Sequence, residues 1–433
     1  MTTLDTLVTT LLQEDVTPLQ NALSHNSVAK LGLQSSKLLD NVFNHTVSQC
    51  VKVTDQKSSG RCWLFATCNM IRMVAMVNVP ELNGLKDFEL SENYLFFFDK
   101  FERYHRLLRY WLSIQALPVD NVLRERYIYE IKQNPLGDGG QFDMATAIVK
   151  KYGVVPKSAY IETYHSSNTK EMNNILQTQL FNDFETLLIP TPDNKIVIIN
   201  TMMQRVFKIL IGFLGKPPTK FEWDFESGKV CHRVAMTPLE FLAHTKFNPD
   251  DYISVIHDPR QEHPINTYYR VKYLGNVRDS MVGWINVSID RLLELSKLMI
   301  DSNHPVWLGC DVAQERDKIS GNCNIGIINN SITGLVDTLT KEQKLRNYLS
   351  LPNHAMLITG YNEASGVVNR WKIENSWGAK GGADGYLLAS NEWMKMYTFE
   401  SVIKKSMLNQ DELLAIDGEQ FIIQPFDPLG CLA

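Results

Sequence analysis

The feature that most constrains the fold is an apolar stretch from Cys62 to Val79, CWLFATCNMIRMVAMVNV. At the 3.6-residue helical period, its apolar residues fall on nearly every side of the axis. A helix of this kind has to be covered all round, so the stretch predicts a buried central helix. With 433 residues, 44% of them apolar, the chain is long enough to build a core around it.

The segment directly before this helix, DQKSSGR, predicts a turn that leads into Cys62. A thiol attacks a carbonyl carbon only as the thiolate. The free N–H groups and the dipole at a helix N-terminus stabilise that anion. Cys62 is therefore a candidate nucleophile. The alternative is that it is a small buried hydrophobic residue, as free cysteines often are.

A catalytic thiol needs a base, normally histidine, and a group that orients the imidazole. His354 begins the strand-like run HAMLITGY, and His304, before Pro305, is the second candidate. Asn375 lies at the end of another strand-like run, in KIENSWG. If these two runs are neighbouring strands, Asn375 lies beside His354.

Gln56 is a candidate oxyanion donor. Its side-chain amide and the Cys62 backbone N–H could together stabilise a tetrahedral oxyanion. This requires the loop from residue 56 to 62 to curl back on itself, which Ser58, Ser59 and Gly60 permit.

The order of the predicted elements favours an α+β fold. Helical patterns dominate residues 1–35, 91–139 and 169–215, whereas short strand-like runs separated by turns follow Tyr268. Helices packed against an antiparallel sheet or barrel fit that order. The second and third helical stretches resemble insertions, and the charge-rich KFERYHRLLRYW is interpreted as a solvated helical face rather than an interaction surface.

Composition excludes several other classes of protein. The net charge of −5 offers no general attraction for nucleic acid or an anionic membrane, which leaves Arg103, Arg106 and Arg109 as the weak basis for a nucleic-acid site. Seven cysteines without a signal-like N-terminus indicate a reducing compartment. The apolar runs KIVIIN and FKILIGFL are shorter than the roughly 20 residues of a membrane span. We expect no metal site and no cofactor.

Several motifs together resemble the papain-like cysteine peptidases, and more narrowly the bleomycin hydrolase and aminopeptidase C family. The motifs are QKSSGRCWLFA, LSENYLFFF, GDGGQFDMATAIVKKYGVVPKSAY, NHAMLITGY and KIENSWG, together with HDPR, YLGNV, PVWLGCDV and PFDPLGCLA. The resemblance implies a papain-like fold. In this fold a helical left lobe holds the central Cys-bearing helix, the right lobe is an antiparallel sheet or barrel, and helical insertions serve oligomerisation.

The resemblance also assigns roles to the candidate residues. It implies Cys62 as nucleophile, His354 as base and then acid, Asn375 as its orienting partner and Gln56 as oxyanion donor. Trp377, in the NSWG motif, would shield the hydrogen bond between Asn375 and His354 from water.

Members of this family are cytoplasmic homohexameric aminopeptidases that act on peptides with a free N-terminus. Their C-terminal tail lies in the cleft. Here the tail is Leu429–Ala433, and Leu432 and Ala433 would limit the substrate through the terminal carboxylate, which pairs with the α-ammonium group. Cys431 departs from the small residue usual in the family. Two alternatives stay open: a catalytically silent homolog that binds nucleic acid or peptide, and an endopeptidase if the tail is displaced.

We expect one papain-like peptidase unit spanning residues 1–433. Its approximate parts are an N-terminal helical lead-in (1–45), the catalytic helix region (46–98), a helical insertion (99–136), the cleft region (137–165), a second helical insertion (166–220), a β-rich lobe (221–425) and the C-terminal tail (426–433).

Overall fold

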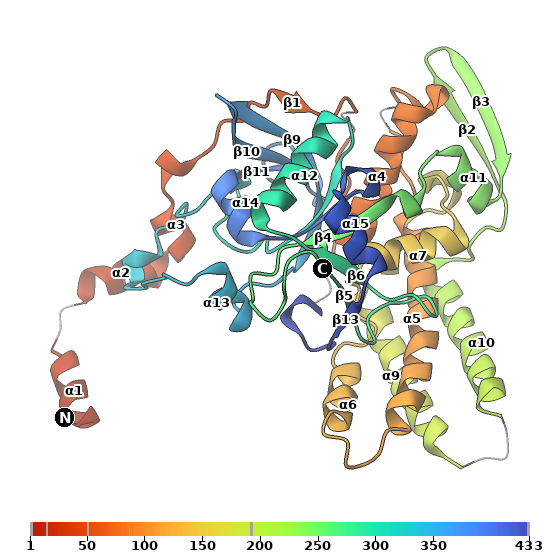
Figure 1. The fold of residues 1–433 in the computed structure, drawn as a ribbon, viewed down its shortest axis with the longest axis horizontal. Coiled ribbons are helices and arrows are strands. Elements are labelled where there is room, and N and C mark those ends of the chain that lie inside the picture. Colours follow the sequence, from red (N-terminus) through yellow and green to blue (C-terminus); the bar gives the residue numbers. More distant parts are fainter. Residues whose placement is uncertain (1–2, 14–15, 50–51, 86, 191–193, 431–433) are drawn as a thin grey trace.

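The computed structural model describes residues 3–13, 16–49, 52–85, 87–190 and 194–430 (Figure 1). The predicted central helix is α4, Cys62–Asn78, and every side chain from Cys62 to Met76 is buried. Helices contact one side of α4 and a large sheet contacts the other. The fold is therefore α+β, as predicted, with its core gathered around this helix.

The neighbours of α4 come from distant parts of the chain. The Trp307 indole donates a hydrogen bond to the Trp63 backbone carbonyl (3.3 Å), which ties the sheet to the first turn of α4. The contacting elements are β7 (Val306–Cys310), β9 (His354–Ala364), α5 (Glu92–Gln115) and α7 (Phe142–Tyr152).

The main sheet has 11 strands in the order β13-β5-β6-β4-β12-β7-β9-β10-β11-β8, with β1 paired to β9. The remaining strands are β1 (His45–Thr46), β4 (Tyr252–Ile256), β5 (Thr267–Val271), β6 (Gly283–Asn286), β8 (Asn322–Cys323), β10 (Val367–Glu374), β11 (Tyr386–Ser390), β12 (Thr398–Lys404) and β13 (Gln420–Ile423).

The sheet is mixed rather than purely antiparallel. The central run from β4 through β12, β7, β9 and β10 to β11 is antiparallel, whereas β4–β6, β5–β13 and β8–β11 are parallel. The alternation of apolar residues reports which face of a strand is buried, and it carries no information about the direction of the neighbouring strand. The parallel pairs could not be predicted for that reason.

Helices also cover the sheet within the strand-rich half of the chain. Helix α12 (Ile289–Asp301) packs on β12 and β9, α14 (Asn391–Tyr397) on β10 and β11, and α15 (Gln410–Asp417) on β5 and β6. Further elements are α1 (Leu4–Leu11), α2 (Thr17–His25), α3 (Val28–Gly32), α8 (Tyr164–Ser167), α11 (Pro238–His244), α13 (Lys341–Arg346) and the hairpin β2 (Phe221–Ser227) with β3 (Val230–Met236).

Four helices form an arm that projects from the rest of the molecule (Figure 1). They are α5, α6 (Arg124–Lys132), α9 (Lys170–Leu188) and α10 (Lys195–Leu214). The two predicted helix-rich stretches therefore lie together. Helix α5 is continuous from Glu92. The predicted start of the first helical insertion, at residue 99, therefore falls inside this helix.

Helix α10 joins the two apolar runs that seemed too short for a membrane span when taken separately. Its 20 residues are long and apolar enough to cross a membrane by length and composition, a test that a core helix also passes. Its buried residues recur every three or four positions and face α5 and α9. They are Ile199, Met202, Met203, Val206, Leu210 and Leu214.

The charge-rich part of α5 is not a solvated face, so that interpretation is wrong. Lys100, Arg103 and Arg106 are all buried. Lys100 donates to the backbone carbonyls of Leu136 and Gly137, and Arg103 donates to that of Gly137. Buried cations require such partners. The partners lie more than 30 residues away, so the helical pattern alone could not reveal them.

Candidate active site

Cys62 occupies the first position of α4 and is 2% exposed. Burial raises the pKa of its thiol to about 11, and the backbone N–H groups of Ala355 and Trp63 oppose that rise. Ala355 follows His354 directly, so the thiol lies beside the start of β9. The sequence predicted a helix N-terminus here, and α4 begins at this residue.

His354 and Asn375 are brought together by the pairing of β9 with β10, in which Leu357 lies opposite Glu374. His354 begins β9 and Asn375 follows the end of β10, so both lie at the same end of these two antiparallel strands. His354 Nε2 is 2.8 Å from Asn375 Oδ1, and the same oxygen accepts the Ser376 backbone N–H (2.8 Å). The structure therefore confirms the prediction that these two residues lie beside each other.

This hydrogen bond selects one tautomer of the imidazole. An amide oxygen only accepts, so Nε2 carries the hydrogen and Nδ1 has a free lone pair in the neutral ring. Burial lowers the pKa of His354 to about 4; the Asn375 contact opposes this shift, and the Arg316 charge adds to it. The imidazole is therefore neutral across the physiological range unless it gains a nearby anion.

Trp377 covers the imidazole. Its ring centroid lies 4.7 Å from that of His354 with an interplanar angle of 31°, and the Arg316 guanidinium carbon lies 4.7 Å from the centroid of the Trp377 ring. Trp377 is 38% exposed, so its outer edge contacts solvent. This position fits the predicted shielding of the contact between His354 and Asn375.

The loop before α4 curls back as the Gln56 hypothesis required. The Gln56 amide nitrogen donates to the Ser59 carbonyl (2.6 Å), and the Ser59 hydroxyl donates to the Gln56 carbonyl (2.6 Å). Gln56 Oε1 accepts the Ser376 hydroxyl (2.6 Å). The amide orientation is therefore fixed, and one of its two N–H groups is used by Ser59. The positive φ of this turn falls on Lys57 (55°).

Asp138 is a structural residue of the site that the sequence did not single out for any catalytic part. Its carboxylate accepts hydrogen bonds from Lys100 (3.0 Å), the Gly60 backbone N–H (3.1 Å) and Asn173 (2.7 Å), and its backbone carbonyl accepts the Trp63 indole N–H (2.7 Å). Burial opposes its ionisation, yet Lys100 and these hydrogen bonds hold its pKa below the usual range. No short sequence motif links Asp138 to residue 60.

The other candidates lie elsewhere. His304 follows α12, and its Nδ1 is 2.6 Å from the Ser302 carbonyl. Leu432, Ala433 and Cys431 lie outside the described residues. Within the ranges that the structure describes, no group of three or more His, Cys, Asp or Glu is placed to hold a metal ion.

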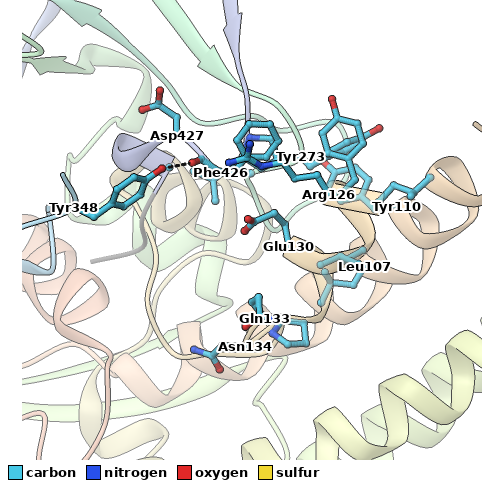
Figure 2. A pocket seen from close by; sticks show the side chains of 17 residues that line it. Leu107, Tyr110, Arg126, Glu130, Gln133, Asn134, Tyr273, Tyr348, Phe426 and Asp427 are labelled. Atoms are coloured by element: carbon cyan, nitrogen blue, oxygen red, sulfur yellow. Dashed lines mark hydrogen bonds between the residues drawn. The ribbon is translucent and has the colours of Figure 1, made fainter. Parts of the chain in front are cut away.

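One hollow adjoins the site, and a second shares a lining residue with it. The first, of about 450 Å³, is lined by Gly60, Gly139 and Asn353, the residue before His354, and also by Asn134. The second, of about 700 Å³, lies between α5, α6 and the C-terminal segment, and Asn134 lines it as well (Figure 2). Gly430, the last described residue, belongs to the second hollow. The two hollows thus share Asn134 as a lining residue.

Comparisons with known proteins agree with this geometry. A family model described as the Peptidase C1-like family matches residues 6–430. The chain is 35% identical to Aminopeptidase C of Listeria monocytogenes over 95% of this chain and 92% of that protein. It is 34% identical to Bleomycin hydrolase of Gallus gallus over 96% and 94%.

A crystal structure of PepW from Lactobacillus rhamnosis HN001 superposes with a TM-score of 0.93 at 33% identity, covering 100% of this chain and 99% of that one. The match extends over the arm as well as the lobes, and it agrees with the papain-like fold that the motifs predicted. The chain therefore belongs to the Peptidase C1-like family.

Proposed function

We propose that the chain is a cysteine aminopeptidase that removes N-terminal residues from peptides. The observation that carries the proposal is the 2.8 Å contact between His354 and Asn375, beside a thiol at the first position of α4. Relatives named Aminopeptidase C and Bleomycin hydrolase support this reading. Because one relative is named Bleomycin hydrolase, we also propose that the chain hydrolyses bleomycin-like amides.

In the proposed reaction, His354 acts first as a base and then as an acid. His354 Nδ1 takes the proton of the Cys62 thiol, and the thiolate attacks the substrate carbonyl carbon. The Cys62 backbone N–H and the Gln56 amide stabilise the resulting oxyanion. The imidazolium then gives its proton to the departing amine as the C–N bond breaks, which leaves a thioester. A water molecule, deprotonated by the same imidazole, releases the acid and restores the thiol.

Burial disfavours both charged forms when each is considered alone, since it raises the pKa of Cys62 and lowers that of His354. Proton transfer from one to the other creates the two charges together. Their attraction in a poorly solvated site offsets part of the desolvation cost. We propose that the reactive state is this thiolate–imidazolium pair, whose ionisations belong to the pair rather than to either residue.

We further propose that the C-terminal residues Leu432 and Ala433 restrict the enzyme to peptides with a free N-terminus. The terminal carboxylate would pair with the substrate α-ammonium group and block the cleft beyond it. Some support comes from Gly430, which lines the hollow of about 700 Å³; that hollow shares Asn134 with the hollow of about 450 Å³ beside Gly60 and Asn353. Displacement of the tail would give an endopeptidase.

The arm supports a proposal of oligomerisation, for which we take the homohexamer of the resembling family. Four aliphatic residues near its tip are exposed, which costs free energy unless another surface covers them. They are Leu188, Ile189, Ile196 and Val197. We also propose a cytoplasmic location, consistent with the free Cys62, Cys68, Cys231, Cys310 and Cys323.

Two of the three arginines that suggested a nucleic-acid site have other partners, whereas Arg109, the third, is exposed. Arg103 and Arg106 are buried and donate to backbone carbonyls, including those of Gly139 (2.8 Å) and Val277 (2.7 Å). Their guanidinium groups are therefore already used inside the protein.

The proposed activity is tested by release of the N-terminal residue from a short peptide. Cys62→Ala should abolish release. Cys68→Ala is the matched control, because Cys68 is a buried cysteine on the same helix, and this variant should retain activity. Equal activity of Cys62→Ala and wild type would rule out the thiol mechanism, and the absence of any release by wild type would favour a silent binding protein.

A further inference from the structure

Arg61, the residue directly before Cys62, is a buried cation that the proposed reaction does not use. It is 0% exposed, and its guanidinium carbon lies 5.2 Å from the centroid of the Phe65 ring and 5.3 Å from that of the Phe96 ring. Because a buried charge is shielded from water, its N–H groups need partners inside the protein. Each of the three guanidinium nitrogens of Arg61 has such a partner.

Glu162 holds one side of the guanidinium. Arg61 Nη1 donates to Glu162 Oε1 (3.2 Å) and Nη2 donates to Oε2 (2.8 Å), which is the two-pronged geometry in which arginine binds a carboxylate most specifically. The Ser166 hydroxyl also donates to Glu162 Oε2 (2.5 Å). Burial alone would raise the pKa of Glu162, but the Arg61 charge and these hydrogen bonds hold it below its usual range. Glu162 is therefore a charged anchor that fixes the position of Arg61.

The third nitrogen of Arg61 binds the loop that carries Gln56. Arg61 Nε donates to the Ser59 hydroxyl oxygen (3.0 Å), and the same hydroxyl donates its hydrogen to the Gln56 backbone carbonyl (2.6 Å). The Ser59 backbone carbonyl accepts one N–H of the Gln56 side-chain amide (2.6 Å), which leaves the second N–H for the oxyanion. Ser59 thus contacts Arg61 on one side, and both the backbone and the side chain of Gln56 on the other.

The other proposed oxyanion donor, the Cys62 backbone N–H, is positioned independently of this network. The Arg61 backbone carbonyl accepts the N–H groups of Leu64 (2.9 Å) and Phe65 (3.0 Å), which closes the first turn of α4. These bonds involve only main-chain atoms, so a change in the Arg61 side chain leaves them in place. Such a change acts on the Gln56 amide instead.

We infer that Arg61, anchored by Glu162, is a positioning residue that sets the place of the Gln56 amide through Ser59. The inference rests on the proposed role of Gln56 as an oxyanion donor. A hydrogen bond weakens steeply when its distance or angle departs from the optimum, so a displaced amide stabilises the oxyanion less. The cost of a looser Arg61 therefore falls on the transition state, while the thiol and the imidazole stay intact.

The test measures hydrolysis of an aminoacyl fluorogenic amide by wild type, Arg61→Lys, Gln56→Ala and the variant with both changes. Lysine keeps the positive charge that Glu162 binds, but its single nitrogen cannot reproduce the fork that contacts Glu162 and Ser59 together. Thermal unfolding verifies that each variant is folded. If Arg61→Lys does not fold, Ser59→Ala, which breaks the link to Gln56 and leaves the ion pair intact, is judged by the same measurements.

Arg106→Lys is the matched control, because Arg106 is a buried arginine of α5 whose guanidinium donates to the backbone carbonyls of Val277 (2.7 Å) and Leu274 (3.3 Å). It should match wild type in kcat. We expect Gln56→Ala to lower kcat about 100-fold, as the loss of an oxyanion donor does. Arg61→Lys should lower kcat about tenfold with KM nearly unchanged. The double variant should be no slower than Gln56→Ala, since Arg61 acts through Gln56.

Alkylation of Cys62 by iodoacetamide separates positioning from general damage to the site. This reaction forms no oxyanion, so Arg61→Lys should keep the wild-type rate of alkylation at pH 7. A parallel loss of alkylation and kcat would overturn the inference, because Arg61 would then support the thiol rather than Gln56.

Two further outcomes overturn the inference and leave the proposed function standing. One is a folded Arg61→Lys variant with wild-type kcat, and the other is a double variant that is slower than Gln56→Ala by the full effect of Arg61→Lys. If Gln56→Ala keeps wild-type kcat, the proposed role of Gln56 fails and the inference fails with it. If wild type does not hydrolyse the substrate, the proposed function itself fails.

Discussion

At Cys62 two physical effects act on the thiol pKa in opposite directions. The helix N-terminus favours the thiolate, yet burial raises the pKa of the thiol to about 11. Reactivity near neutral pH therefore depends on a base that takes the proton within the same site. His354, whose Nε2 is committed to Asn375, offers Nδ1 for that purpose.

This dependence gives a prediction for His354→Gln. Without the base, alkylation of Cys62 by iodoacetamide should be slow at pH 7 and should rise only as the pH approaches the raised thiol pKa of about 11. Wild type should react at neutral pH. The measurement is the rate of alkylation against pH, with mass spectrometry to confirm the modified residue. Identical pH profiles for the two proteins would mean that His354 does not activate the thiol.

The Asn375 contact leads to a second prediction. Asn375→Ala frees the imidazole to rotate, so we expect kcat to fall on the order of 100-fold, at the lower end of what general acid–base catalysis contributes. KM should change little, since the proposed role of the side chain is to orient His354 and not to bind the substrate. Steady-state kinetics separates the two constants, and a change confined to KM would contradict the orienting role.

The residues whose positions the sequence predicted are those with a local signal. Cys62 stands where a turn meets an apolar helix, while His354 and Asn375 stand at the ends of strand-like runs. Asp138 and Lys100 have no such signal, because each binds groups that are distant along the chain. Their contacts depend on tertiary packing, which periodicity does not encode.

At the scale of elements, α4 packs tightly against the loop that contains Gly140. A Cβ placed on Gly140 would lie 2.5 Å from the Trp63 ring, whose indole is hydrogen-bonded to Asp138. Gly140→Ala should therefore push the ring or the loop aside and lower the free energy of unfolding by about 1–3 kcal/mol, as overpacking does. Urea unfolding measures this difference. Gly212→Ala is the control, since its Cβ meets nothing within 4 Å.

Strand β12 carries a buried acid, Glu400, which accepts the Ser254 hydroxyl (2.6 Å). Burial raises its pKa to about 8, the Ser254 contact opposes the rise, and Asp143 adds to it. The folded protein thus keeps a proton that the unfolded chain releases from about pH 4.5 upward. The contribution of Glu400 to stability is present below that pH and is lost as the pH rises toward 8.

Glu400→Gln should remove this dependence, because the amide stays neutral and still accepts from Ser254. The free energy of unfolding should fall less between pH 5 and pH 9 in the variant, by about 1.4 kcal/mol for each unit by which the pKa is raised. Denaturant titrations at both pH values measure the change. An equal fall in wild type and variant would show that Glu400 does not contribute it.

Some helices and strands were predicted correctly and others were not, and each outcome has a physical reason. Periodicity identified α4, the arm helices and strands such as β7, β9, β10 and β11. It could not give the parallel pairs of the sheet, nor the burial of the α5 charges, since both are set by neighbours distant in sequence. Helix α12 was missed within a region whose short apolar runs pointed to strands.

For the whole molecule, the exposed tip of the arm predicts how copies assemble. Val197→Glu places a charge on an apolar surface that we propose is covered by another subunit, so the assembly should dissociate into smaller species. Thr201→Glu is the control, because Thr201 is an exposed polar residue of α10. Light scattering after gel filtration gives the mass of each form. A wild-type monomer, or unchanged assembly in Val197→Glu, would contradict the proposed interface.

The most direct test of the central claim concerns the thiol and the tail together. It measures hydrolysis of an aminoacyl fluorogenic amide and of its N-acetylated form by wild type, Cys62→Ala and the chain lacking Leu432 and Ala433. We predict that wild type cleaves only the free-amine substrate, that Cys62→Ala cleaves neither, and that truncation permits cleavage of the acetylated form. Equal cleavage of both substrates by wild type, or persistent activity in Cys62→Ala, would contradict a tail-gated cysteine aminopeptidase.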